Sequence, residues 1–162
     1  MMKLTLTSQV GSTLLAVVAL AATSFGADFY RVDQASERNF DETVQQLQWA
    51  FGGYGLTTVT AVDYQQILKK SKVDTGRAAM FEVMRREWLK IVLQEDPALG
   101  MMLPVRVYVF EQPDAKIVVS YQRPGAMLET HEKEVVRAFG RQLDEKFRSL
   151  IAQTTTKSKE QR

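Results

Sequence analysis

His131 is the side chain of this sequence best suited to proton transfer near neutral pH, and it is the only histidine. It precedes Glu134 by three positions near the start of an expected helix, so the two side chains share one helix face. A general base needs a nucleophile and an orienting group, and the sequence identifies neither. Zinc usually takes roughly three or four protein ligands. His131 is therefore a candidate metal ligand, while a solvent-facing helix histidine is the simpler interpretation.

A noncovalent haem site is a second use for His131. The sequence has no cysteine and hence no Cys-x-x-Cys-His motif for covalent attachment. Met127 or the Met101–Met102 pair would supply the other axial ligand. Met80 and Met84 could likewise suggest capture of copper(I), but methionines near strand ends commonly fill a hydrophobic core. A haem or metal carrier therefore stays open as one class of function.

Arg106 and Arg123 are the candidate ligand-binding residues. They belong to, or closely follow, the two strands of an expected hairpin. If both side chains project from the same face of the sheet, they could bind a carboxylate or a phosphate bidentately. Arginines that alternate outward from a half-buried strand are usually solvated, which is the competing interpretation. The sequence reveals no set of catalytic residues.

Three glycines, Gly52, Gly53 and Gly55, are close enough together to suggest a phosphate-binding loop. Such a loop requires the order strand, glycine loop, helix. Here the glycines follow an expected helix instead, so we interpret them as a helix end and a turn.

Composition excludes several classes of protein. The 162 residues are 45% hydrophobic and 25% charged, which is typical of a folded globular chain of one domain. The net charge is +2, with basic and acidic residues interleaved, so no basic stripe indicates a nucleic-acid partner. The absence of cysteine excludes disulfides, iron–sulfur clusters and thiolate zinc sites, and it fits an oxidising compartment.

Residues 1–26 have the features of a cleavable secretory signal peptide. Lys3 carries the only charge ahead of nine apolar residues, Leu14–Ala22, and small residues at Ser24 and Gly26 mark a cleavage site. The apolar run is shorter than the roughly 20 residues that a transmembrane helix needs. We therefore expect a periplasmic or secreted protein without a stable membrane anchor after cleavage.

Hydrophobic periodicity predicts the secondary structure of the rest of the chain. The predicted strands are 29–32, 56–62, 78–84, 101–110 and 116–121, and the predicted helices are 41–51, 63–70, 87–94 and 129–152. This order, β-α-β-α-β-α-β-β-α, indicates a single two-layer α+β domain with a mixed β-sheet, packed by amphipathic helices and ending in a long C-terminal helix. We expect the domain to occupy 27–153, with 154–162 as a polar disordered tail. Trp49 and Trp88 are expected to anchor helices to the sheet.

Two segments resemble a known bacterial family, the domain of unknown function number 302. The first is Phe40-x-x-Thr43-Val44-x-x-Leu47, followed by the glycine turn, Val59-x-x-Val62-Asp63 and Leu68-Lys69-Lys70. The second is Glu95–Glu111, which is similar to the family's segment of an acidic residue, proline, a glycine, Leu-Pro and a strand. The resemblance covers roughly 29–127. It implies a compact α/β sandwich-like domain, often a homodimer, with no agreed activity.

The sequence departs from this family at the positions of its cysteines. Many members have a Cys-Asn-Pro-like triplet before the third helix and a cysteine directly after Leu-Pro. Here Met84-Arg85-Arg86 and Val105 occupy these places. An activity that depends on those residues is therefore not carried over, and the chain resembles a divergent member without cysteines.

These observations favour an exported, non-enzymatic module that binds a small ligand or a protein, with no nucleic-acid partner and with a homodimer as its possible state. Two alternatives come from other classes. One is a noncovalent haem or metal carrier that uses His131. The other is a small enzyme whose site the sequence does not reveal.

Overall fold

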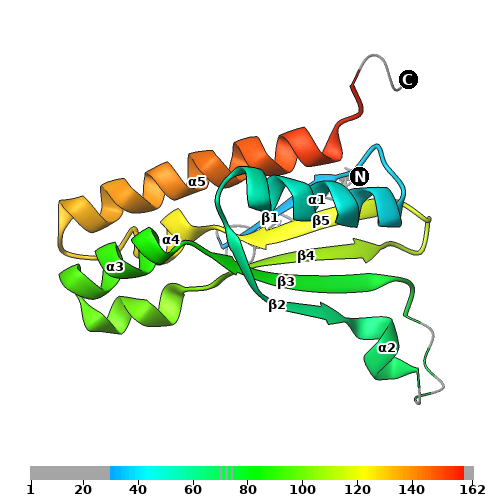
Figure 1. Ribbon diagram of the computed structural model, residues 1–162, viewed down its shortest axis with the longest axis horizontal. Coiled ribbons are helices and arrows are strands. Elements are labelled where there is room, and N and C mark those ends of the chain that lie inside the picture. Colours follow the sequence, from blue (N-terminus) through cyan, green and yellow to red (C-terminus); the bar gives the residue numbers. More distant parts are fainter. Residues whose placement is uncertain (1–29, 70, 72, 74, 159–162) are drawn as a thin grey trace, which may run out of the picture.

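Five strands form one sheet in the order β1-β5-β4-β3-β2, and every neighbouring pair is antiparallel (Figure 1). The computed structural model describes residues 30–69, 71, 73 and 75–158, so the predicted signal peptide lies outside it. The elements are β1 (Arg31–Ala35), α1 (Phe40–Gly53), β2 (Thr57–Asp63), α2 (Tyr64–Leu68), β3 (Ala78–Met84), α3 (Arg86–Glu95), η1 (Pro97–Met102), β4 (Val105–Glu111), β5 (Ile117–Gln122), α4 (Pro124–Leu128) and α5 (Glu134–Thr155). The predicted α+β class and element order are confirmed, while the sheet is antiparallel rather than mixed.

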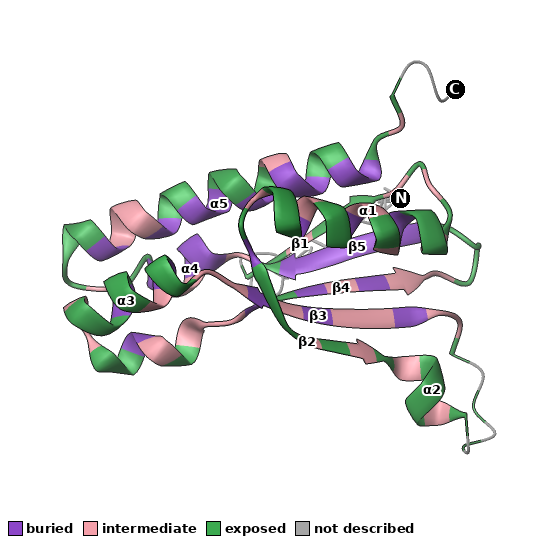
Figure 2. Ribbon diagram, viewed as in Figure 1, coloured by how far each residue is buried: buried purple, intermediate pink, exposed green. Residues whose placement is uncertain are grey.

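Helices α1 and α5 pack together on one face of this sheet (Figure 1). Alternate residues of the central strands point into the interface with the helices, as the twofold period of a strand requires. The buried residues that make up this core include Leu47, Phe51, Phe81, Val83, Val105, Val107, Val109, Val119, Tyr121, Leu143, Phe147 and Leu150. Figure 2 shows the same pattern, with buried residues along β5 and at intervals along α5. The last helix is thus amphipathic, as predicted.

The N-terminus of α1 has a reciprocal cap. The Asn39 side chain accepts a hydrogen bond from the Glu42 N–H at 2.9 Å, and the Glu42 carboxylate accepts one from the Asn39 N–H at 3.4 Å. At the other end the helix stops at the glycine turn, where Gly55 has a φ of +67°. The glycines therefore end a helix and form a turn, as we expected from the order of the elements.

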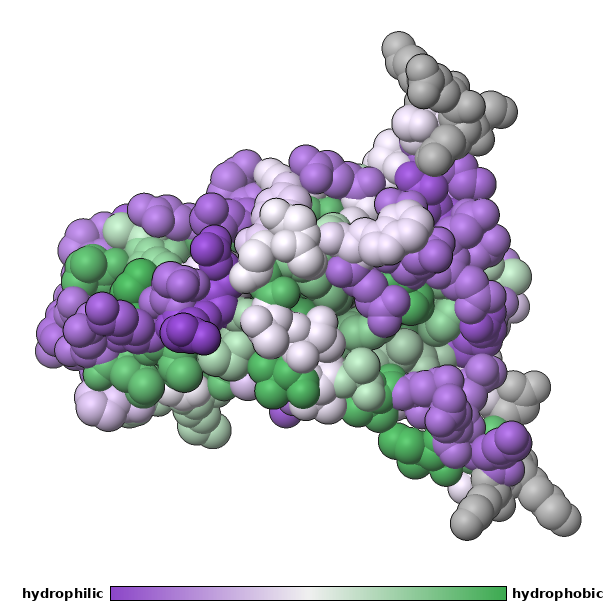
Figure 3. All heavy atoms as spheres, in the orientation of Figure 1, coloured by the Kyte–Doolittle hydropathy of each residue, from purple (hydrophilic) through white to green (hydrophobic). Residues whose placement is uncertain are grey.

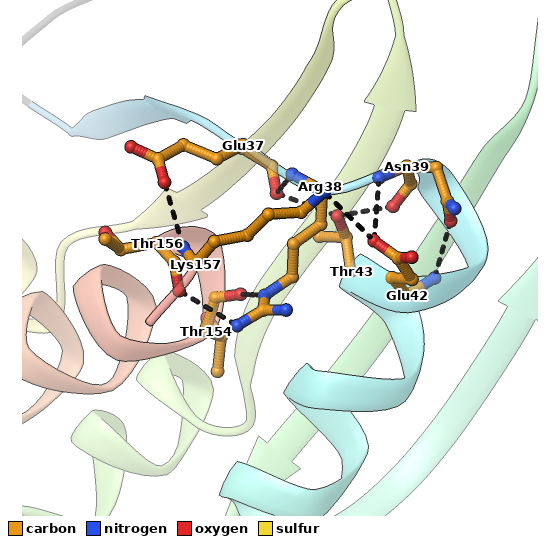
Figure 4. A network of polar contacts seen from close by, with 9 residues as sticks. Glu37, Arg38, Asn39, Glu42, Thr43, Thr154, Thr156 and Lys157 are labelled. Carbon is orange, nitrogen blue, oxygen red and sulfur yellow. Dashed lines mark hydrogen bonds and ion pairs between the residues drawn. The ribbon is translucent and has the colours of Figure 1, made fainter. Parts of the chain in front are cut away.

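The turn between β1 and α1 also closes the C-terminal end of α5 (Figure 4). Arg38 donates from Nε to the Thr154 carbonyl at 3.1 Å and from Nη2 to the Thr156 carbonyl at 2.9 Å. The Glu37 N–H donates to the Thr155 carbonyl at 2.8 Å. These donors satisfy carbonyls that a helix end leaves without partners. Thr154 and Thr155 are buried helical residues as a result, so the prediction that the disordered tail begins at 154 is wrong.

Two boundaries differ from the predictions because short helices occupy segments that we had assigned to longer elements. Residues Pro97–Met102 form η1, with the Asp96 side chain accepting from the Ala98 N–H, so β4 begins at Val105 and not at 101. The predicted helix from 129 likewise starts five residues later, because α4 precedes α5 as a separate turn.

The first strand and one of the two tryptophans also differ from the predictions. Strand β1 spans Arg31–Ala35 rather than 29–32, because its register is set by pairing with β5. Trp88 is buried and its ring lies 6.0 Å from that of Phe147, so it anchors α3 as expected. Trp49 is 62% exposed on α1 and does not reach the sheet.

A buried carboxylate joins α5 to the end of the sheet. Asp144 accepts hydrogen bonds from Arg123 Nη2 at 2.9 Å and from the Gly125 N–H at 2.8 Å. The contact needs glycine, because a Cβ at Gly125 would lie 2.3 Å from the Asp144 carboxylate and one at Gly140 would lie 3.0 Å from the Gly125 Cα. Asp144 therefore fixes where α4 and α5 approach each other.

We expect Asp144→Ala to lower the free energy of unfolding by about 2 kcal/mol, because Arg123 and the Gly125 N–H would both lose their acceptor. The matched control is Glu145→Ala at the neighbouring exposed position, which should change it by about 0.5 kcal/mol or less. Urea denaturation followed by circular dichroism measures both variants. Equal effects of the two substitutions would show that Asp144 does not join these elements.

Candidate functional site

The face of the sheet opposite α1 and α5 carries a cluster of three aromatic side chains and one methionine, which we call the aromatic face. Its members are Tyr64, Met80, Tyr108 and Phe110. Tyr108 and Phe110 alternate along β4 with the buried valines, and their rings stack at a centroid separation of 5.3 Å. Helix α2 places the Tyr64 ring 5.5 Å from that of Tyr108, and the Tyr64 hydroxyl donates to Met80 Sδ at 3.5 Å. Asp63 positions this helix by capping it, since its side chain accepts hydrogen bonds from the Gln65 and Gln66 N–H groups.

A row of polar side chains crosses the same face next to the aromatic residues. Arg31 pairs in register with Gln122, and Arg106 pairs with Glu82. Gln122 directly follows Tyr121, the partner of Val107, so it lies beside Arg106. The row therefore runs from β1 through β5 and β4 to β3. We call Arg31, Gln122, Arg106 and Glu82 the polar row.

A hollow of about 470 Å³ lies where the aromatic face meets the polar row. Its lining includes Tyr64, Met80, Tyr108, Phe110, Arg31, Arg106, Ser120 and Gln122. The volume is within the range of roughly 300–1,000 Å³ that is typical of small-molecule sites. Apolar walls with a few polar groups at one side are what an amphipathic ligand needs.

Each of the two arginines of this site forms an ion pair with a neighbouring carboxylate. Arg106 Nε lies 3.1 Å from Glu82 Oε1, and Arg31 Nη2 lies 2.7 Å from Asp33 Oδ2. Ser120 is buried and its hydroxyl donates to Asp33 Oδ1. The two guanidinium groups are nevertheless accessible, since their side chains are 60% (Arg31) and 58% (Arg106) exposed.

Burial raises the pKa of the Tyr108 phenol, and the nearby Tyr64 adds to the shift. The shift favours the neutral phenol. Tyr108 is therefore an apolar wall of the hollow with a neutral hydroxyl at neutral pH, and it is not a phenolate base.

A larger hollow of about 630 Å³ lies beside the β4–β5 turn. It is lined by polar residues that include Arg77, Glu111 and Gln112. Arg77 already forms a bidentate contact with Asp41 and lies 4.3 Å above the Phe40 ring. Because the charge of Arg77 is already paired and no aromatic ring is among the described lining residues, this hollow fits an amphipathic ligand less well than the aromatic face does.

The structure does not bring Arg106 and Arg123 together. Arg106 projects from the aromatic face, whereas Arg123 begins α4 and bonds Asp144 on the helix side of the sheet. Their positions are of opposite parity along the paired strands β4 and β5, so their side chains point to opposite faces. The condition that we set for a shared anion site is not met.

His131 lies in the turn before α5 and is largely enclosed, with 13% of its side chain exposed. Nδ1 accepts a hydrogen bond from the Lys133 N–H at 3.1 Å, and Nε2 faces Asp96 Oδ2 at 3.5 Å. The residue is thus not the solvent-facing helix histidine of the simpler interpretation. Both ring nitrogens have a neighbour, and the described residues contain no group of three or more His, Asp and Glu side chains that could hold a metal. His131 is therefore not part of such a group in the described residues.

Residues 32–154 match the family described as Domain of unknown function DUF302. The chain belongs to this family. The fold is also similar to the crystal structure of an uncharacterized conserved protein DUF302 from Bacillus stearothermophilus, with a TM-score of 0.70 and 12% identity over 78% of this chain and 98% of that chain. At this identity the likeness concerns the fold. No curated protein sequence matches the chain significantly.

Most members of the candidate site were missed from the sequence, among them Arg31, Tyr64 and Gln122. Arg31 joins the site only because β1 pairs with β5, which is distant in sequence. Tyr64 joins it through the fold of α2 back over β3. The alternation of Arg106, Tyr108 and Phe110 with three valines was visible, and it was the signal that one face of β4 carries a surface of its own.

The DUF302 domain has further exposed apolar side chains at the end formed by α3 and η1. Ile91, Leu93 and Met101 are exposed there, and hydrophobic groups gather at this end of the space-filling view (Figure 3).

None of the helices in the described part of the chain combines the length and apolar character needed to cross a membrane.

Tyr108→Phe should remove a phenol that ionises above its ordinary pKa of about 10. Spectrophotometric titration of the tyrosines in the folded protein measures this, and the high-pH end of the curve should lose the absorbance of one phenolate. The folded state favours the neutral phenol of Tyr108. The stability linked to this phenol is therefore fully present below about pH 10, and it is lost as the pH rises through the raised pKa. A loss confined to the ordinary range would contradict the raised pKa of Tyr108.

Proposed function

We propose that this DUF302 protein is a non-enzymatic binding module that holds a small amphipathic ligand on the aromatic face. The observation that carries the proposal is the hollow of about 470 Å³ in which aromatic rings adjoin accessible arginines. Burial of apolar area on the rings would supply affinity at about 25 cal/mol per Å² before the costs of association. The polar row would orient the ligand.

The groups around the hollow favour binding over catalysis. Ser120 is the hydroxyl nearest to a carboxylate there, but it donates to Asp33 and has no imidazole to activate it. The single histidine of the chain is held by Lys133 and Asp96 at the α3 end of α5. The neutral Tyr108 adds no base. A small enzyme remains the alternative, and it would need a nucleophile brought by its substrate.

A planar neutral probe, 2-naphthamide, tests the proposal by isothermal titration calorimetry with the full chain. We expect saturable binding that Tyr64→Ala and Tyr108→Ala each weaken about tenfold, because aromatic pairs contribute about 0.5–1.5 kcal/mol beyond the area that they bury. The control is Trp49→Ala, which removes an exposed aromatic ring from the helix layer and should leave the affinity unchanged.

Thermal melts of the same variants separate loss of binding from loss of folding. Tyr64 lies in α2 outside the hydrophobic core, so its replacement should leave the melting temperature nearly unchanged. Failure of 2-naphthamide to bind the folded wild-type protein, or equal weakening by Trp49→Ala, argues against the aromatic face as the binding site.

We also propose that the protein works in the periplasm or after secretion, once residues 1–26 are removed. The apolar run and the small residues before Ala27 support this. Cleavage there would leave every described strand and helix in place, since the first begins at Arg31.

Native mass spectrometry of the protein from the periplasm of its host tests the export proposal. The expected chain begins at Ala27, because signal peptidase accepts small residues one and three positions before the bond. The same spectrum gives the oligomeric state, for which the resemblance predicts a homodimer. A chain that retains Met1 and stays with the cytoplasmic fraction would overturn the export proposal.

A further inference from the structure

We infer that the ligand is an aromatic carboxylate whose carboxylate group binds between Arg31 and Arg106 while its ring lies on Tyr108. This inference rests on the proposed binding function of the aromatic face and names the class of ligand. It replaces the arrangement expected from the sequence, in which Arg123 was the partner of Arg106.

The first step is the placement of the two arginines. Arg31 on β1 and Arg106 on β4 lie on either side of Gln122 on β5, and all three line the hollow. Neighbouring strands are about 4.8 Å apart, so the two backbones are separated by about 10 Å. An arginine side chain is long enough to cover half of that distance. Two guanidinium groups and one amide can therefore converge on a single small group.

The second step concerns the hydrogen-bonding groups that the ion pairs leave over. Asp33 uses Oδ1 for the Ser120 hydroxyl and Oδ2 for Arg31, and Glu82 receives Arg106 Nε. The charges of the row and of Asp33 balance, but the numbers of donors and acceptors do not, because each guanidinium has five N–H groups. Within the described part of the chain, the two terminal nitrogens of Arg106 have no side-chain acceptor. The surplus of donors selects an acceptor-rich group such as a carboxylate over an ammonium group.

The third step is the distance between the charged group and the ring. Arg106 and Tyr108 are two residues apart on β4 and share its face, which corresponds to about 6.8 Å along the strand. A carboxylate attached directly to an aromatic ring spans a similar length. Such a molecule can place its oxygens at the polar row and its ring against Tyr108. A ligand ring can add an offset-stacked or edge-to-face contact to the stacked Tyr108 and Phe110 rings, which an aliphatic acid cannot make.

The test compares 2-naphthoate with the neutral and nearly isosteric 2-naphthamide by isothermal titration calorimetry at pH 7. We expect the carboxylate to bind at least about tenfold more tightly, because hydrogen bonds to a charged acceptor are the stronger ones. Arg31→Gln and Arg106→Gln should each bring the affinity for the carboxylate close to that for the amide. Each substitution should weaken binding of the carboxylate more than binding of the amide, since the amide carries no charge and the rings are untouched.

Arg148→Gln is the matched control, because Arg148 is an exposed arginine on α5 that is paired with Glu145. It should affect neither ligand. Raising the salt concentration should weaken the carboxylate and not the amide, and this comparison needs no variant, so it decides the question even if an arginine variant fails to fold.

The outcomes separate the two proposals. If both molecules bind with equal affinity and salt has no effect, the carboxylate site is overturned while the binding function stands. If neither molecule binds the wild-type protein, the binding function fails and the inference falls with it. If Arg106→Gln and Arg148→Gln weaken the binding of 2-naphthoate equally, the preference for the carboxylate comes from the general charge of the protein, and the proposed site is overturned.

Discussion

The pleat of β4 determines the arrangement of the whole domain. Val105, Val107 and Val109 are buried against α1 and α5, and a strand that buries every second residue must direct the others to the opposite face. Arg106, Tyr108 and Phe110 therefore lie together on one surface without any further contact to place them there. A shift of one residue in the register would exchange the two sets and put an arginine into the core. The stability of the valine core is thus what keeps the proposed site on its own side of the sheet.

The helix layer is held against that core by polar contacts at its two ends. Asp144 binds α5 to the turn after β5, and Arg38 binds the last carbonyls of α5 to the turn after β1. Both contacts involve the segments that flank β1 and β5, the two strands that carry Arg31 and Gln122. The helix side and the aromatic face of the sheet are therefore connected through the ends of the same strands. Large side chains fill the middle of the layer, whereas at the α4–α5 crossing Gly125 and Gly140 allow close approach.

The fold could be predicted from local patterns to the extent that one face of each element is apolar. The valines of β4 and the stripe of α5 marked these elements, and the glycine turn marked the end of α1. The ends of elements were less predictable, because η1, α4 and the last turn of α5 depend on caps and tertiary contacts such as that of Arg38. Only part of the candidate site could be predicted from the sequence, for the same reason. Arg106 stood out in its own strand, but its neighbours on β1 and β5 follow from a register that only the folded sheet defines.

The pairing of the first strand with the last has a consequence for the order of folding. Asp33 and Ser120, which bond across this pair, are 87 positions apart in the chain, whereas β4 and β5 are joined by a short hairpin turn. Closing the long loop costs entropy that the short hairpin does not. Strand β1 emerges first during synthesis or translocation, yet it has no sheet to join until β5 exists. The β4–β5 hairpin can form early, so the part of the polar row on these two strands, Arg106 and Gln122, precedes the part that Arg31 completes. The domain therefore completes the polar row only when nearly the whole chain has been released.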